Sequence, residues 1–159
     1  MKSFEIRPYE KGDFAAVAAI HDAARLQELY RAGLPEAYVP FEQMAPKTKL
    51  LEEYSVFVAD VDDNVRGFVA FKEGELALLY VNPLFARQGI GIALARYALV
   101  SREGDKTVTR VLAGNEPALA LCKAAGFVET GKETGPLPGN SRYKATLLCL
   151  EQTGEVSLF

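Results

Sequence analysis

The sequence predicts a single α/β domain in which helices pack on a mixed β-sheet. Helical and extended hydrophobic patterns alternate along the chain, and neither an internal repeat nor a linker divides it. The length of 159 residues suits one domain with one hydrophobic core, so the domain is expected to span residues 1–159. In the middle of the chain, an apolar strand leads through a glycine-containing turn into a helix.

The N-terminal third is predicted to hold one strand and two helices. Phe4–Arg7 alternates in polarity before a proline, which predicts a strand. Apolar residues at helical spacing predict a helix from Phe14 to about Tyr30, with Asp13 as its N-cap. A glycine and a proline end this helix, and a second helical stretch is expected from about Glu42 to Tyr54, interrupted by Pro46.

Three strands joined by tight turns are predicted next. Val56–Ala59 and Gly67–Phe71 flank the turn sequence Asp62-Asp63-Asn64, and Glu73-Gly74 precedes the third strand, Leu76–Val81. Such short connections predict an antiparallel meander. The third strand is apolar at every position, so we expect it to lie centrally in the sheet with both faces covered.

The C-terminal half alternates helices and strands. In chain order the sequence predicts a helix over 89–101, a strand over 107–113, a helix over 117–125 ended by Gly126, a strand over 127–130, a Gly/Pro-rich loop over 131–140 and a strand over 141–151. The resulting order, β-α-α-β-β-β-α-β-α-β-β, predicts an α/β sandwich with a mixed sheet.

Composition narrows the classes of function. A formal net charge of −3 without a basic patch argues against a nucleic-acid partner. The charged N-terminal sequence lacks the apolar region of a signal peptide, and the longest apolar run, Leu76–Val81, is too short to span a membrane. Two cysteines predict a reduced, cytoplasmic compartment. A single histidine without a Cys/His cluster argues against a metal site.

The most informative segment is the turn after the third strand of the meander. Arg87-Gln88-Gly89-Ile90-Gly91 opens a helix, and backbone N–H groups at a helix N-terminus have no partners within the helix. These groups and the helix dipole favour a phosphate ligand, and Arg87 adds a cation. Glycine at positions 89 and 91 leaves room for the ligand to approach the backbone.

Three kinds of phosphate loop compete for this segment. No Lys-Ser or Lys-Thr follows Gly91, as a P-loop requires, and Leu94 stands where a dinucleotide fingerprint needs glycine or alanine. The segment instead resembles the central motif of the GCN5-related N-acetyltransferase (GNAT) superfamily, Q/R-x-x-G-x-G/A after a V-x-P strand end. Val81-Asn82-Pro83 and the residues from Ala86 to Gly91 match this motif, except that Ala86 replaces its first Gln or Arg.

A second segment strengthens the resemblance. The run from Asn115 to Phe127 is similar to the family's N-x-x-A-x-x-L-Y-x-x-x-G-F sequence. The resemblance implies a GNAT-type sheet, mixed and mostly antiparallel, with helices on both faces and splayed central strands. It also implies that acetyl-CoA is the co-substrate, bound by Leu79, Tyr80, Val81, Arg87, Gln88, Gly89, Ile90, Gly91, Ile92 and Asn115. An N-cap of the helix that follows is an additional role for Asn115.

The catalytic groups are less well defined. Cys122 stands where most family members carry a tyrosine, the usual proton donor to the departing thiolate, so Cys122 is either a weak substitute acid or a passive small residue. One branch of the family places a glutamate on the fifth strand, and it has no counterpart here between Thr109 and Ala113. Glu75, at the start of the fourth strand, is the candidate general base, with a solvated turn residue as the alternative. Tyr80, Arg142 and Tyr143 are further candidates, as residues that face the acceptor.

The predicted activity is transfer of acetyl from acetyl-CoA to a primary amine by direct attack. The acceptor is expected to be a small molecule or a protein amino group, shaped by the segments 31–44 and 131–140. A degenerate GNAT domain that binds acyl-CoA as a sensor or scaffold is the alternative, because Ala86 and Cys122 both depart from the family pattern. A nucleotide-binding protein is a third reading of the loop. The resemblance also raises a homodimer as an option.

Overall fold

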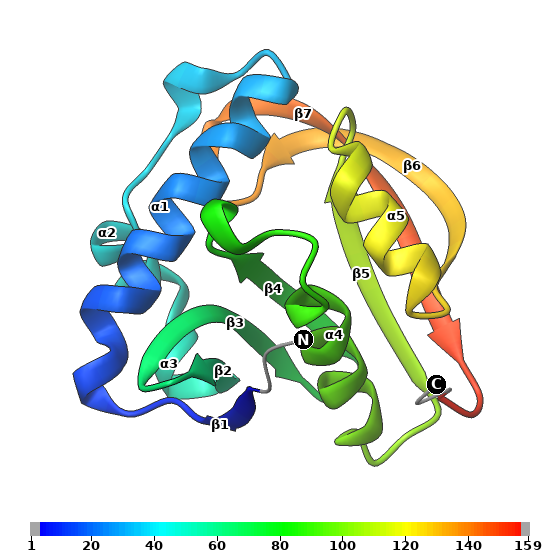
Figure 1. The fold of residues 1–159 in the computed structure, drawn as a ribbon. Coiled ribbons are helices and arrows are strands. Elements are labelled where there is room, and N and C mark those ends of the chain that lie inside the picture. Colours follow the sequence, from blue (N-terminus) through cyan, green and yellow to red (C-terminus); the bar gives the residue numbers. More distant parts are fainter. Residues whose placement is uncertain (1–3, 157–159) are drawn as a thin grey trace.

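A computed structural model describes residues 4–156 and shows an α/β domain built on one seven-stranded sheet (Figure 1). The strand order is β1-β2-β3-β4-β5-β7-β6. All neighbouring strands are antiparallel except β4 and β5, which run parallel. The strands are β1 (Glu5–Pro8), β2 (Ser55–Val61), β3 (Asn64–Lys72), β4 (Glu75–Val81), β5 (Lys106–Leu112), β6 (Val128–Leu137) and β7 (Asn140–Thr153). The predicted mixed, mostly antiparallel sheet is confirmed.

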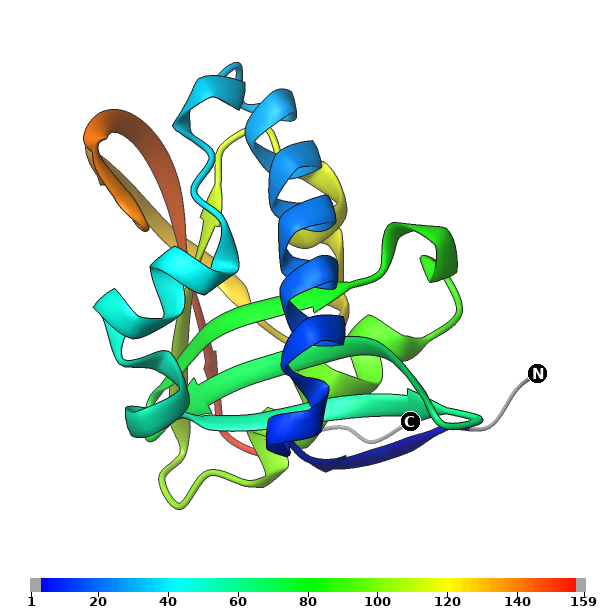
Figure 2. The ribbon, with the colours of Figure 1, turned by 90° about the vertical axis from the view of Figure 1, so that its left-hand side faces the viewer.

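Helices cover both faces of the sheet. They are α1 (Phe14–Arg31), α2 (Phe41–Thr48), α3 (Leu50–Glu53), α4 (Ile90–Val100) and α5 (Glu116–Ala124), with 3-10 turns η1 (Lys11–Asp13), η2 (Pro35–Ala37) and η3 (Pro83–Phe85). One core cluster joins α1 and α2 to β2 and β3, and a second joins α4 and α5 to the opposite face. Figure 2 shows α1 crossing the strands of the N-terminal half of the sheet.

Asp13 precedes α1 as predicted, but it does not cap the helix with its side chain. Its carboxylate instead accepts hydrogen bonds from both terminal nitrogens of Arg7, at 2.8 and 2.9 Å, and from the N–H of Glu10. Arg7 also donates to Asp60 of β2. The acid therefore ties the start of α1 to the edge of the sheet rather than to the helix itself.

The predicted second helix is two helices. Lys49 adopts a left-handed conformation, with φ of 53°, between α2 and α3. Pro46 lies inside α2 without breaking it. At the sixth residue of an eight-residue helix it removes one hydrogen bond, and the packing of Phe41, Met44 and Ala45 into the core holds the helix.

The expected loop over 131–140 is wrong in extent, because β6 continues to Leu137 and only two residues separate it from β7. β6 is an edge strand, where glycine and proline are tolerated since one side needs no ladder hydrogen bonds. Register shifts beside Gly131 and Pro136 absorb these residues. Figure 2 shows the resulting hairpin projecting from the rest of the sheet.

β4 is the fourth of seven strands, so its predicted central position is confirmed. Its side chains are mostly half-buried rather than fully covered. The reason is its neighbour β5, with which it makes a single register pair, Glu75 with Val108. Beyond that pair the two strands diverge toward their C-terminal ends, as Figure 1 shows, and this wedge between β4 and β5 positions the site.

Candidate active site

The wedge leaves part of the β4 backbone without a strand partner. The N–H of Asn82 donates to the Arg66 carbonyl of β3 at 2.7 Å. Because backbone groups alternate in direction along a strand, those of Tyr80 also point to β3, whereas those of Leu79 and Val81 point toward β5. β5 pairs only at the closed end of the wedge. The N–H and C=O groups of Leu79 and Val81 can therefore pair with an extended ligand.

A β-bulge at Ala77 sets the direction of these groups. Leu76 pairs with Phe71 and Leu78 pairs with Ala70, so Ala77 has no partner in β3. Such an extra residue bends a strand and increases its twist. At the closed end, Thr109 of β5 donates its hydroxyl to the Leu76 carbonyl at 2.8 Å. The strands are thus fastened just before the bulge and separate just after it.

The predicted phosphate loop lies at the open end of β4 and leads into α4. Gly89 is the residue before the helix and has φ of +85°, with open space where a side chain would stand. The backbone N–H groups of Ile90, Gly91 and Ile92, at the start of α4, have no partners within the helix, whose first bond runs from the N–H of Ala93 to the Gly89 carbonyl. Arg87 and Gln88 are exposed beside them, and Arg87 has a positive φ of 63°. This arrangement can bind a phosphate.

Gly91 has a different role from the one expected. It is buried, and a Cβ there would stand 2.5 Å from Cδ1 of Leu121 on α5. Glycine at 91 therefore allows α4 and α5 to pack closely, whereas glycine at 89 provides the turn and the open approach. Ile90 is buried in the α4-side core and Ile92 is half-buried against it.

Two local contacts order the loop between β4 and α4. The Asn82 side chain accepts from the N–H of Leu84 at 3.0 Å and caps η3. The guanidinium of Arg66 lies 3.8 Å from the ring centroid of Phe85, a cation–π contact between β3 and the loop. The loop is therefore held at both ends of η3 before it reaches Gly89.

Asn115 follows β5 and is buried. Its Oδ1 accepts from the N–H of Ala118 at 3.3 Å, which makes it the N-cap of α5. Its Nδ2 donates to Oε2 of Glu28 on α1 at 2.8 Å. Both ends of the Asn115 amide are therefore engaged within the protein.

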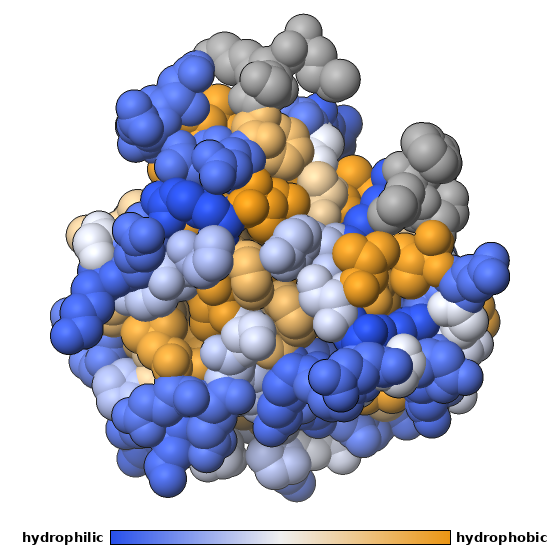
Figure 3. Space-filling view, turned by 90° about the horizontal axis from the view of Figure 1, so that it is seen from below, coloured by the Kyte–Doolittle hydropathy of each residue, from blue (hydrophilic) through white to orange (hydrophobic). Residues whose placement is uncertain are grey.

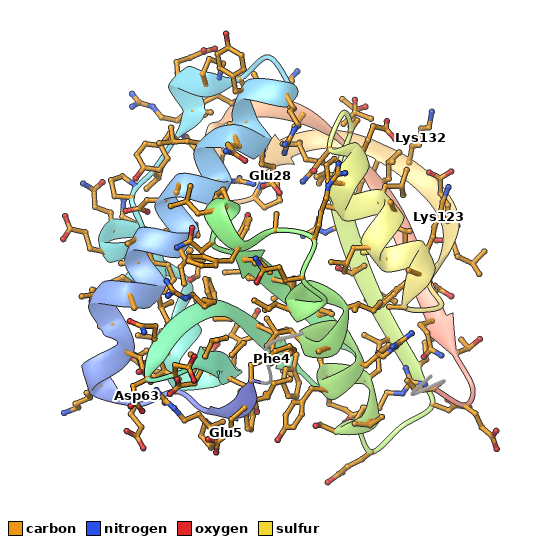
Figure 4. All side chains as sticks on the ribbon, in the orientation of Figure 1. Phe4, Glu5, Glu28, Asp63, Lys123 and Lys132 are labelled. Carbon is orange, nitrogen blue, oxygen red and sulfur yellow. The ribbon has the colours of Figure 1, made fainter. Side chains whose placement is uncertain are left out.

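Glu28 is a site residue that the sequence analysis missed. Oε1 accepts from the Tyr80 hydroxyl at 2.9 Å and from the Arg25 guanidinium, and Oε2 accepts from Asn115. Glu28 thus joins α1 to both arms of the wedge, and Figure 4 shows it on α1 beside the ends of β4 and β5. The signal was present, because His21, Arg25 and Glu28 recur at i, i+4 and i+7 and form a polar stripe along α1.

The aromatic groups of this cluster are neutral at pH 7. Burial, followed by the negative charge of Glu28, raises the pKa of Tyr80 above its ordinary value, so the phenol remains a donor. Burial lowers the pKa of His21, with Asp22 opposing the shift. The His21 ring meets Tyr80 edge-on at 5.4 Å between centroids and holds the tyrosine in place.

Cys122 lies on α5 within the core cluster under α4, and only 8% of its surface is exposed. Burial raises its pKa to about 11, so the thiol is protonated at neutral pH. Glu75 lies at the closed end of the wedge, where it pairs with Val108. Since β4 has seven residues, Glu75 is roughly 20 Å along the strand from Val81. That position does not favour Glu75 as a base for chemistry at the open end.

The remaining expectations concern metals, membranes and partners. Among residues 4–156, no group of three or more His, Cys, Asp or Glu side chains is placed to hold a metal ion. No helix in the described part of the chain is long and apolar enough to cross a membrane. On the face drawn in Figure 3, apolar side chains are interspersed with hydrophilic ones. In the described part of the chain the exposed large apolar side chains are spread over several elements: Leu26 and Tyr30 on α1, Leu84 on η3, Val100 on α4, Val108 on β5 and Val128 on β6.

The chain is similar in sequence to known N-acetyltransferases. A model of the acetyltransferase (GNAT) domain matches residues 52–129, which include β4, the loop before α4, and α5. An uncharacterized N-acetyltransferase of Escherichia coli, YafP, is 29% identical over 111 residues, covering 68% of this chain and 73% of YafP. The E. coli peptidyl-lysine N-acetyltransferase YiaC is 36% identical over 72 residues, or 45% of this chain and 48% of YiaC.

Solved structures share the fold over nearly the whole chain. A ribosomal-protein-alanine N-acetyltransferase from Brucella melitensis superposes with a TM-score of 0.72 at 22% identity, covering 94% of this chain and 99% of that one. The acetyltransferase yncA from Salmonella typhimurium, solved with acetyl-CoA, gives a TM-score of 0.69 at 17% identity, covering 98% of this chain and 96% of that one. At these identities the likeness concerns the fold.

Proposed function

Because the chain belongs to the GNAT superfamily and is an acyltransferase, we propose that it transfers acetyl from acetyl-CoA to a primary amine by direct attack. The observation that carries this proposal is the wedge between β4 and β5, which opens beside the N-terminus of α4. Backbone groups of β4 that can pair with an added strand are followed along the chain by the N–H groups of α4, which can bind an anion. Such a surface suits an extended amide chain that ends in a pyrophosphate.

Each part of the co-substrate has a counterpart in the chain. The pantetheine amides pair with the backbone groups of Leu79 and Val81, as an added strand does. The pyrophosphate lies against the first N–H groups of α4, with Arg87 beside it. The thioester then lies within the wedge near Tyr80. The yncA structure with acetyl-CoA supports acetyl-CoA as the donor.

The protein contributes position and electrostatics to the reaction. Backbone donors facing the wedge stabilise the oxyanion that forms as the amine attacks the carbonyl carbon. The two bound partners are held in contact, so the step becomes effectively unimolecular. Cys122 contributes packing, because its thiol lies in an apolar core and carries no charge at pH 7.

The acceptor class proposed is a primary amine, either on a protein or on a small molecule. YiaC acts on peptidyl-lysine, which supports a protein amino group as one candidate. The unpaired state of Cys122 and Cys149 supports a reduced, cytoplasmic location. Homodimerisation remains a proposal, and a sedimentation measurement would test it.

Calorimetric titration with acetyl-CoA tests the cofactor assignment. Wild type is expected to bind with micromolar affinity, and Gly89→Glu is expected to lose at least tenfold, because its carboxylate occupies the phosphate position. Gly154→Glu is the matched control, since Gly154 also has a positive φ and open space around it but lies at the C-terminal end of β7. Equal loss in both variants, or no binding by the wild type, would refute the proposed cofactor site.

Ala86 and Cys122, which depart from the family pattern, favour one second candidate, an acyl-CoA sensor. Release of free thiol from acetyl-CoA in the presence of amines separates the two functions. Turnover of any amine supports the enzyme, whereas tight binding without turnover across polyamines, amino acids and lysine peptides supports the sensor.

A further inference from the structure

We propose that Glu28 receives the ammonium group of the acceptor on Oε2 and is the group through which its proton leaves. This inference rests on the proposed acetyltransferase function and adds a catalytic residue to it. Neither Glu75, which lies at the closed end of the wedge, nor Cys122, which lies in an apolar core, occupies a comparable position.

Glu28 is attached to both arms of the wedge. Tyr80 approaches it from β4, and Asn115 approaches it from the turn after β5. These partners are 52 and 87 residues from Glu28 in sequence, so only the tertiary fold brings the three together. Any acceptor that reaches a thioester held between the two strands meets this carboxylate.

A count of hydrogen bonds shows where an ammonium can bind. A carboxylate offers about four acceptor positions, two on each oxygen. The described contacts fill both positions of Oε1, from Tyr80 and Arg25, and one position of Oε2, from Asn115. One position of Oε2 remains for an external donor. The Glu28 side chain is 13% exposed, so its negative charge is largely desolvated but accessible to a slender group.

The surrounding groups fix the carboxylate in this role. Arg25 on α1 is the cation that faces it, and Arg25 also donates to the Pro138 carbonyl of the β6–β7 turn at 2.7 Å. Tyr80 from β4 and Asn115 from the β5–α5 turn are neutral donors, and His21 packs against the ring of Tyr80. Arg25, Tyr80 and Asn115 all donate to Glu28, so its carboxylate is the hydrogen-bond acceptor of this cluster.

The proposed reaction begins with a proton transfer from the acceptor to Glu28. The ammonium gives one proton to Oε2, and that proton passes to solvent. The nitrogen lone pair then forms the C–N bond to the thioester carbonyl carbon, and collapse of the tetrahedral intermediate breaks the C–S bond. The sulfur leaves with the electron pair of that bond, and the second proton lost by nitrogen ends on the thiol. The products are an N-acetyl amide, the CoA thiol and one proton in solution.

The test compares two nucleophiles with acetyl-CoA. Butylamine, like lysine, has a pKa on the order of 10.4 and is an ammonium at pH 7, whereas hydroxylamine is neutral there. Glu28→Gln is expected to lower kcat/KM for butylamine by about 10² to 10⁴-fold and that for hydroxylamine by less than about fivefold. Acetyl-CoA affinity is expected to be unchanged. Glu129→Gln, the same change at an exposed position, is the control.

The outcomes separate the two proposals. A wild-type protein that fails to bind acetyl-CoA, or binds it and acetylates neither nucleophile, refutes the acetyltransferase function and this inference with it. A Glu28→Gln variant that keeps butylamine turnover within threefold refutes the inference alone. Equal loss for both nucleophiles assigns Glu28 a structural role and also overturns it. If Glu28→Gln fails to fold, Glu28→Asp provides the same comparison, with butylamine again expected to suffer more.

Discussion

At the scale of single residues, two glycines of this protein have different roles, and so do two of its carboxylates. Gly89 provides a left-handed turn in open space, whereas Gly91 removes a side chain from a helix–helix contact. Asp13 is bound to arginine and fastens the N-terminal strand, whereas Glu28 is bound to arginine and also faces the wedge. Residue type alone therefore does not distinguish the structural from the chemical role.

The burial of Cys122 predicts a pH dependence of the free energy of unfolding. The folded pKa of its thiol, about 11, exceeds the unfolded value of 9.0, so the folded state holds the proton more tightly. Stability from this group is complete below pH 9 and is lost as the pH rises toward 11. Wild type should lose about 1.4 kcal/mol from this group between pH 7 and pH 10.

Urea unfolding of Cys122→Ala at both pH values checks this expectation. The alanine variant lacks the titrating thiol, so its deficit relative to wild type should shrink by about 1.4 kcal/mol at pH 10. Cys149→Ala, at a half-buried cysteine, serves as the comparison. A deficit for Cys122→Ala that does not change with pH would contradict the assigned burial effect.

At the scale of elements, the packing of α4 on α5 depends on Gly91. Gly91→Ala is expected to destabilise the protein by about 1–3 kcal/mol through overpacking, although alanine is the better helix former. The contact atom belongs to Leu121, so Leu121→Ala should relieve the clash, and the pair should couple by at least about 0.5 kcal/mol. Urea unfolding of the double-mutant cycle measures this coupling. Additive effects would show that the contact is unimportant, and Gly131→Ala, which meets no neighbour, is the neutral control.

Local signals in the sequence predicted most elements but fewer of their interactions. The β4 strand, the turn at Gly89 and the helix after it follow from hydrophobic pattern and glycine placement, so this strand–turn–helix unit was predicted at the right place. The β6 strand was missed beyond residue 130, because Gly131 and Pro136 are breakers everywhere except at a sheet edge. Glu28 was missed because its partners Tyr80 and Asn115 meet it only through tertiary packing.

At the scale of the whole molecule, the sheet is two halves joined at one point. Strands β1–β4 carry α1 and α2 on one face, and β5, β7 and β6 continue the sheet beyond the wedge. The single β4–β5 register pair and the Thr109 hydroxyl join the halves at the closed end. At the open end, Glu28 bridges them through Tyr80 and Asn115. An extended ligand in the wedge would therefore complete the sheet.

Completion of the sheet predicts an alternating pattern of amide hydrogen exchange along β4. The N–H groups of Leu79 and Val81 face the wedge, so acetyl-CoA should slow their exchange by at least about tenfold. Those of Tyr80 and Asn82 are directed to β3 and should change by less than about threefold. NMR exchange rates with and without saturating acetyl-CoA measure all four, and Gly89→Glu should abolish the effect. Uniform slowing along the strand would indicate general stabilisation by ligand rather than strand pairing, and would contradict the proposed binding mode.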